Sequence, residues 1–158
     1  MYSLKTKKKD ITYGQRKLLD LLDHRKLMAF SREHNLSFVY VFNIAIGKNF
    51  PPPVMIFNLR SIIPPETWFF KESDPLPPGH IYSIKSAYKD WDYTKSIAYK
   101  AFQKTENLKG FCRDNDLQYT SLTLVHRGKR APSFQKIKLL MNVFYPADWF
   151  FSPDEIKD

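Results

Sequence analysis

Cysteine, glycine and long apolar runs are scarce in this sequence, and each shortage excludes a class of protein. One cysteine among 158 residues excludes a disulfide framework within the chain, so we expect a reducing, cytoplasmic compartment. No apolar run approaches the roughly 18 residues of a membrane span, and no secretion-signal pattern is visible. The five glycines form no loop that would cradle a phosphate group.

Residues that carry catalysis or hold metal ions do not cluster either. The four histidines are scattered, and a single cysteine cannot complete a zinc site, so we expect no metal and no cofactor. Asp90 and Asp92 make a short acidic pair beside Trp91, but no base, nucleophile or metal ligand accompanies them. The sequence therefore predicts a protein that is not an enzyme and has no catalytic residue.

The chain does have positive charge, and its apolar fraction is high enough for a packed core. It is 43% apolar and 16% aromatic, which is typical of a globular rather than a disordered chain. The formal net charge is +9, and the parts before and after His80 are both basic. This charge favours a polyanionic partner such as nucleic acid.

An internal repeat organises the sequence. Residues 26–70 recur without a gap as residues 107–151. The identical pairs are Leu27/Leu108, Phe30/Phe111, Arg32/Arg113, Leu36/Leu117, Gly47/Gly128, Lys48/Lys129, Pro51/Pro132, Ile56/Ile137, Leu59/Leu140, Pro65/Pro146, Trp68/Trp149, Phe69/Phe150 and Phe70/Phe151. Tyr13 and Tyr93 extend the match upstream at an offset of 80, with one residue gained in the loop before Asn107, so each copy spans roughly 60 residues. Such a period suits two tandem small domains.

The chain therefore divides into four expected segments. They are a flexible basic arm over residues 1–10, a first module over 11–70, a linker over 71–92 and a second module over 93–158. Prolines deny the first part of the linker the hydrogen bonds of a helix. We expect its aromatic part, with Tyr82, Tyr88 and Trp91, to pack on one of the modules.

Apolar spacing predicts helices over residues 14–26, 27–35 and 54–62 of the first copy, and over 95–104, 108–116 and 133–143 of the second. Asn35 and Asp116 tolerate left-handed backbone geometry, so each is a suitable helix stop. Residues 37–46 and 118–127 are ambiguous, because their β-branched and aromatic composition alone would indicate buried strands.

The second copy resembles a known family in the order and spacing of its motifs. A bulky and a small residue at Phe111 and Cys112 are followed by Asp116 and Leu117, then by Gly-Lys-Arg-Ala-Pro-Ser at residues 128–133. A closing Pro-x-x-Trp-Phe-Phe completes the pattern. Over residues 95–151 the chain resembles the phage-repressor (lambda-repressor-like, XRE-type) helix-turn-helix family. The resemblance implies an all-α fold of two tandem modules, each with about five short helices, and helices in both ambiguous segments.

The resemblance also implies double-stranded DNA as the partner. In this family the third helix enters the major groove, and here that recognition helix would present Gln118 as its N-cap, with Tyr119, Thr120 and Thr123 on its groove-facing side. Just beyond it, Arg127, Lys129 and Arg130 would contact phosphates and set the docking position. Cys112, like Ser31 in the first copy, would be the small residue needed where two helices cross.

The first copy departs from the family pattern. Its groove-facing positions would be Phe38, Val39, Phe42 and Asn43, and a helix apolar on every side is normally buried. We therefore expect the first module to be structural or dimerising, with its apolar helix covered by the second module or by a second chain in a homodimer.

These features favour a sequence-specific double-stranded DNA-binding protein, a transcriptional regulator or repressor whose second module is the main reading head. The alternative is a protein-interaction module, inhibitor-like or antitoxin-like, on a degenerate repressor scaffold. The apolar first copy favours the alternative, whereas the basic second copy opposes it. RNA binding is a third interpretation, which the charge permits but no RNA-binding motif supports.

Overall fold

The computed structural model describes residues 10–85 and 89–157, and this part of the chain is predominantly α-helical. It contains eight α-helices, four 3₁₀ helices and two strands of two residues each. The expectation of an all-α protein is confirmed at this level. None of these helices is long and apolar enough to cross a membrane. Residues 1–9 of the expected basic arm lie outside the described residues.

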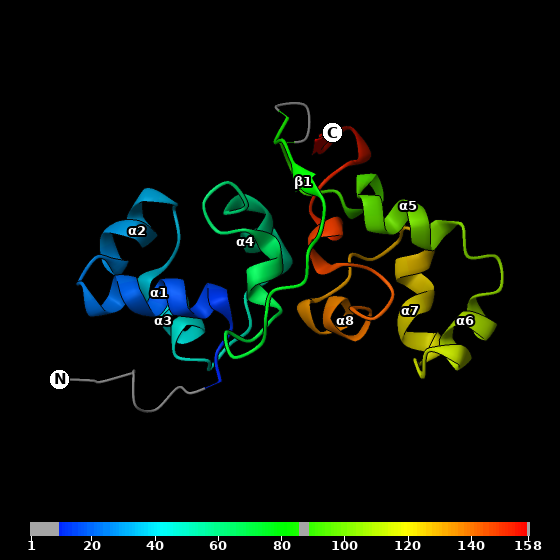
Figure 1. Ribbon diagram of the computed structural model, residues 1–158, viewed down its shortest axis with the longest axis horizontal. Helices are drawn as coiled ribbons and strands as arrows, with labels where there is room; N and C mark the ends of the chain where they lie inside the picture. Colours follow the sequence, from blue (N-terminus) through cyan, green and yellow to red (C-terminus); the bar gives the residue numbers. More distant parts are fainter. Residues whose placement is uncertain (1–9, 86–88, 158) are drawn as a thin grey trace.

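The sequence repeat returns as a repeat in the order of the elements, with the two halves side by side in Figure 1. The first half contains α1 (Tyr13–Asp23), α2 (Leu27–Glu33), α3 (Phe38–Ala45), α4 (Pro53–Asn58) and η1 (Pro65–Trp68). The second contains α5 (Ile97–Gln103), α6 (Leu108–Asp114), α7 (Tyr119–His126), α8 (Phe134–Leu139) and η3 (Pro146–Trp149). The remaining elements are β1 (Ile81–Tyr82), η2 (Tyr93–Lys95), η4 (Pro153–Glu155) and β2 (Ile156–Lys157).

Both segments of strand-like composition are helices, as the resemblance to the repressor-like module implied. In α3 the hydroxyl of Ser37 accepts a hydrogen bond from the N–H of Tyr40, which satisfies one of the unpaired donors of the first turn. The apolar face of each helix is buried in its own half, so tertiary packing outweighs the β-propensity of the residues. Gly47 and Gly128 then follow with positive φ angles of 83° and 77° and end both helices.

The turn that precedes each of these helices also follows the prediction. Asn35 and Asp116 both have a φ angle of 56°, in the left-handed region that asparagine and aspartate tolerate. Ser31 and Cys112 are each 1% exposed, and burial raises the pKa of the Cys112 thiol. This burial agrees with a packing role for the small residue at that position.

The first helices of the two halves are aligned differently from the sequence prediction. The N–H of Tyr13 donates to the carbonyl of Phe70, and the N–H of Ile97 donates to the carbonyl of Phe151. Tyr13 therefore corresponds to Ile97, and its expected pairing with Tyr93 is wrong. Tyr93 lies in η2, ahead of α5. The mismatch arises because α1 has 11 residues and α5 only seven, a difference that gapless matching cannot accommodate.

The expected linker packs on the second half through its aromatic side chains, as predicted. The ring of Tyr82 stacks on that of Phe151, with centroids 3.9 Å apart. The indole N–H of Trp91 donates to the carbonyl of Trp149 at 2.9 Å. Strand β1 pairs antiparallel with β2, which holds this segment against the end of the chain. Tyr88 lies outside the described residues.

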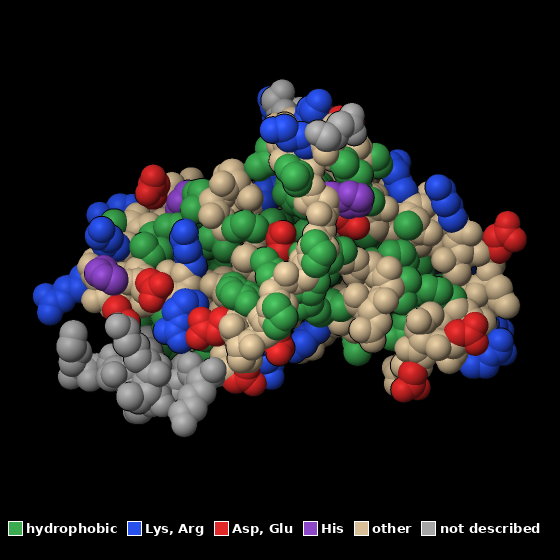
Figure 2. All heavy atoms as spheres, in the orientation of Figure 1, with side chains coloured by type: hydrophobic (Ala, Val, Ile, Leu, Met, Phe, Trp, Pro, Cys, Tyr) green, Lys and Arg blue, Asp and Glu red, His purple; other side chains and the backbone are tan. Residues whose placement is uncertain are grey.

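The halves meet at a junction, the surface where residues 50–70 of the first half contact residues 134–155 of the second. Phe134 is stacked between Phe69 and Phe50, at centroid distances of 4.5 Å and 4.9 Å. Such pairs contribute about 0.5–1.5 kcal/mol each beyond the burial of their area. Aromatic contacts therefore contribute much of the junction. Figure 2 shows that hydrophobic side chains also gather on the surface near the middle of one face, among charged side chains of both signs.

One buried ion pair crosses this junction. Nη1 of Arg60 lies 3.1 Å from Oε1 of Glu155, and the side chains are 5% and 0% exposed. Arg60 also donates to the carbonyl of Phe150 at 2.8 Å. Glu155 further accepts hydrogen bonds from the N–H groups of Ser152 and Lys85, at 3.0 Å and 2.8 Å. These bonds compensate for removing the carboxylate from water.

The apolar helix of the first half does not have the place that its sequence predicts. Helix α3 packs on α1 and α2 of its own half. Phe38 and Phe42 are half-buried, and Val39 is 65% exposed. The expectation that this helix is covered by the second module is therefore wrong, because the junction is built from the larger aromatic run Trp68–Phe69–Phe70 and its surroundings. Burial of α3 against a second chain stays a prediction.

Two half-buried carboxyl groups lie on the 3₁₀ helices η1 and η3, which contact each other. Burial raises the pKa of Glu66, and the charge of Asp148 raises it further. Burial also raises the pKa of Asp148, although a hydrogen bond from the Tyr82 hydroxyl (2.5 Å) and the charge of His80 oppose this. Oε1 of Glu66 has no hydrogen-bond partner among the described residues. The ionised form of Glu66 is thus poorly stabilised.

We expect Arg60→Met to lower the free energy of unfolding by about 3–5 kcal/mol, because the buried Glu155 carboxylate loses its counter-charge. Urea unfolding followed by circular dichroism measures this loss. The control is Lys71→Met, which breaks an ion pair to Asp10 whose side chains are 52% and 55% exposed. That control should leave the unfolding free energy nearly unchanged. Equal losses in both variants would contradict a special contribution from the buried pair.

We expect Glu66→Gln to raise the free energy of unfolding at neutral pH. A carboxyl group whose pKa is raised by folding binds its proton more tightly in the folded state than in the unfolded state. The protonated group therefore stabilises the fold below its ordinary pKa of 4.5, and this contribution is lost as the pH rises through the raised pKa. The gain from the substitution should therefore shrink as the pH falls toward 4.5. Urea unfolding across this pH range measures it, with exposed Glu106→Gln as control. A variant less stable than the wild type at neutral pH would refute the interpretation.

Candidate nucleic-acid interface

Helix α7 is held in place at its C-terminal end by residues from the preceding elements. The hydroxyl of Tyr93 donates to the carbonyl of Val125 at 3.0 Å, and that of Tyr99 donates to the carbonyl of His126 at 3.0 Å. Burial raises the pKa of Tyr93 to about 12, so this phenol stays a donor at neutral pH. A ring nitrogen of His126 lies 3.1 Å from the carbonyl of Thr105. The two tyrosine bonds satisfy carbonyls at the end of the helix, and all three contacts orient it on its half.

The N-terminal end of α7 carries four of the predicted residues. Gln118 is the N-cap, it is exposed, and its side chain forms no capping hydrogen bond, so the amide is available to another partner. Thr120 is exposed, whereas Tyr119 and Thr123 are half-buried. The Thr123 hydroxyl donates to the carbonyl of Tyr119 at 2.8 Å, which leaves its oxygen as an acceptor. This end thus offers an amide and hydroxyl groups together.

The other three predicted residues lie in the turn that follows α7. Arg127, Lys129 and Arg130 are all exposed, and none forms an ion pair with any residue the structure describes. The N–H groups of Lys129 and Arg130 both donate to the carbonyl of Leu124, which keeps the turn tight. Gly128, between Arg127 and Lys129, has the positive φ that this turn requires. Three cations are therefore concentrated within four residues.

The structure brings the seven predicted residues into two groups at opposite ends of one helix. A helix of eight residues is about 12 Å long, so one end can lie in a groove while the turn at the other end meets the strand beside it. The polar end and the basic turn are thus spaced to contact a nucleic acid, with the polar end at the base edges in a groove and the basic turn at the phosphates. Helix α7 alone connects these two groups of residues.

Sequence reasoning missed one cation and two anchors of this surface. The ammonium of Lys109, on α6, lies 5.4 Å from the ring centroid of Tyr119, close enough for a cation–π contact. Its place near the start of α6 was a usable signal, because α6 precedes α7 in the same motif. Tyr93 and Tyr99 carried no local signal, since their hydrogen bonds to α7 span 32 and 27 residues.

The corresponding surface of the first half has a different character. Where the second half has Arg127 and Arg130, the first has Ile46 and Asn49, so Lys48 is the single cation of its turn. Val39 and Tyr40 on α3 are 65% and 37% exposed. The two copies therefore share a frame but differ in both the charge and the polarity of this surface.

The described part of the chain contains no comparable cluster of side chains for metal binding. No group of three or more histidine, cysteine, aspartate or glutamate side chains there could hold a metal ion. No protein-family model, curated protein or solved structure matches this chain. The candidate site therefore rests on its own geometry and charge.

Proposed function

We propose that this chain is a sequence-specific double-stranded DNA-binding protein, a transcriptional regulator built on two tandem lambda-repressor-like modules. The observation that carries the proposal is α7, a helix with an exposed polar start and a basic turn of unpaired cations at its end. The order and spacing of these parts resemble those of the repressor motif. The second half is the main reading head, and the first half is a structural or dimerising module.

The proposed binding divides into positioning and reading. Arg127, Lys129 and Arg130 contact phosphate oxygens, which fixes the orientation of the protein without reading sequence. An amide such as that of Gln118 can bond adenine in the major groove with two hydrogen bonds, and hydroxyls such as that of Thr120 can bond either class of base edge. The anchored C-terminal end of α7 supports this arrangement, because a rigid helix loses little freedom on binding.

A protein-interaction role on the same scaffold is the second candidate. It is favoured by the exposure of Val39, beside the half-buried Phe38 and Phe42, on the helix that would otherwise be a second reading head. Apolar side chains in a groove-facing position are poor partners for phosphates and base edges. Such a surface fits a second copy of this chain or another protein.

We expect Lys129→Ala with Arg130→Ala to weaken binding to all duplex sequences alike. Each lost phosphate contact should flatten the slope of log affinity against log salt by roughly 0.9. Substituting Thr120 should instead change the preferred sequence, because this side chain would face base edges. Selection from random duplexes, followed by salt titrations on the selected site, measures both effects. A specific site should bind with a Kd of roughly 10⁻⁸–10⁻¹¹ M.

The matched control for this experiment is Lys48→Ala, which occupies the repeat position of Lys129 in the first half. It should leave both affinity and salt slope unchanged. If it flattens the slope as much as Lys129→Ala does, the first half also contacts DNA. Weak binding with no selected sequence and no effect of the Lys129 and Arg130 substitutions would refute the proposed function and leave the interaction role.

We expect Val39→Glu to weaken self-association by about tenfold or more without unfolding the chain. Its side chain is 65% exposed, so a charge there is harmless to the monomer but costly in an apolar contact. Sedimentation velocity over a range of concentrations measures the effect. Val54→Glu is the control, since Val54 is 54% exposed on α4. A wild-type chain that stays monomeric throughout would remove the dimer from the proposal.

A further inference from the structure

A cavity of about 300 Å³ lies at the junction, a volume at the lower end of the range for small-molecule sites. Both halves contribute to it. The first half supplies the start of α1, the loop between α3 and α4, and η1, while the second half supplies α8. Its aromatic walls are Phe50, Trp68, Phe69 and Phe134. A ligand here would contact both halves at once.

The aromatic walls favour a flat occupant. The rings of Phe50, Phe134 and Phe69 form one stack, with interplanar angles of 15° and 13°. Phe50 ends this stack and is 53% exposed, although it is a large apolar side chain. Ring faces and edges lining a narrow cavity suit another planar ring better than a branched aliphatic group.

In the second half, an aromatic side chain of the connecting segment covers the phenylalanine at the repeat position of Phe69. Phe150 stands at the repeat position of Phe69, and the indole of Trp91 stacks on it with centroids 5.6 Å apart at 22°. Trp91 comes from the segment just ahead of the first helices of that half. The described residues ahead of α1 are Asp10, Ile11 and Thr12, which bring no ring, and the cavity lies against them and Phe69. In the first half Phe134 stacks on Phe69 instead, and an aromatic molecule in the cavity would lie beside that stack.

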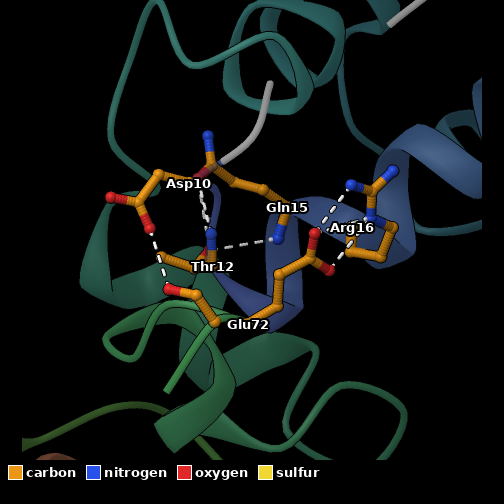
Figure 3. Close-up of polar contacts among 6 residues, drawn as sticks. Asp10, Thr12, Gln15, Arg16 and Glu72 are labelled. Carbon is orange, nitrogen blue, oxygen red and sulfur yellow. Dashed lines mark hydrogen bonds and ion pairs between the residues drawn. The ribbon is translucent and has the colours of Figure 1, made fainter. Parts of the chain in front are cut away.

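The charged and polar groups of the lining determine which ligand charge the cavity favours. Figure 3 shows Thr12 hydrogen-bonded to Gln15, and Asp10 accepts from both Lys71 and Ser73. These polar groups therefore satisfy one another. Lys138 of α8 also lines the cavity and forms no ion pair within residues 10–85 and 89–157. The uncompensated charge at the cavity is thus positive.

We propose that this cavity is a binding site for a flat aromatic acid of about two fused rings, with its carboxylate directed to Lys138. The ring system lies in the cavity against the exposed ring of Phe50, beside the buried rings of Trp68 and Phe69. The ammonium of Lys138 pairs with the carboxylate at the mouth. The site is independent of DNA, so it stands or falls separately from the proposed function.

The test titrates 2-naphthoate into the full chain without DNA and follows the indole N–H signals by NMR. The Trp68 signal is identified by its absence in Trp68→Phe, and its N–H has no hydrogen-bond partner among the described residues, so it reports a ring bound nearby. The expected result is a saturable shift of this signal with a Kd of about 1 mM or tighter. No saturable shift would overturn the proposal.

Substitutions then test each part of the site. Lys138→Gln should weaken 2-naphthoate about fivefold and leave the neutral 2-naphthamide unchanged. Lys136→Gln, on the same helix but outside the lining, should affect neither. Ile11→Trp should abolish binding by placing an indole in the cavity, and Phe50→Ala should weaken both probes without unfolding the chain, because Phe50 is half exposed. Equal loss in the two lysine variants, or unchanged binding in Phe50→Ala, would overturn the proposal.

Discussion

The carboxylate of Glu155 is the group on which the arrangement of the two halves depends. It receives Arg60 from the first half, the N–H of Ser152 from the second and the N–H of Lys85 from the connecting segment. A fully buried charge is tolerated only when such partners replace water, so these three parts of the chain must meet in one geometry. The stack of Phe69 on Phe134 adds apolar area but little direction. The relative orientation of the two halves is set by the ion pair of Arg60 and Glu155.

Once the junction is fixed, the two copies are free to differ on the surfaces that it leaves exposed. The polar side of α7 and the apolar side of α3 occupy the same position of the repeat, yet the first, with the basic turn that follows it, is suited to a polyanion and the second to an apolar partner. The junction itself is also asymmetric, because Phe134 of the second half stacks on Phe69, whereas Trp91 of the connecting segment stacks on Phe150 at the equivalent position. Duplication thus supplied a frame, and divergence supplied separate surfaces.

Most of the helical frame was predictable because its signals are local. The helical state of α3 and α7 was implied by the family resemblance, since their composition favours strands, and the left-handed turns followed from Asn35 and Asp116. The seven predicted residues of the site also lie together, since they share one helix and one turn. The errors concern length and contact: Tyr13 corresponds to Ile97, and α3 packs on its own half.

By itself the sequence determined the twofold repeat, the helix positions and the basic turn after α7, because caps, stops and apolar spacing act over a few residues. Only the tertiary structure decided which surfaces meet. The anchoring of α7 by Tyr93 joins residues 32 positions apart, and the pairing of Arg60 with Glu155 joins residues 95 positions apart. The cavity beside Phe134 likewise depends on residues from both halves of the chain. No local pattern encodes such contacts, because they depend on how whole faces fit once each half has folded.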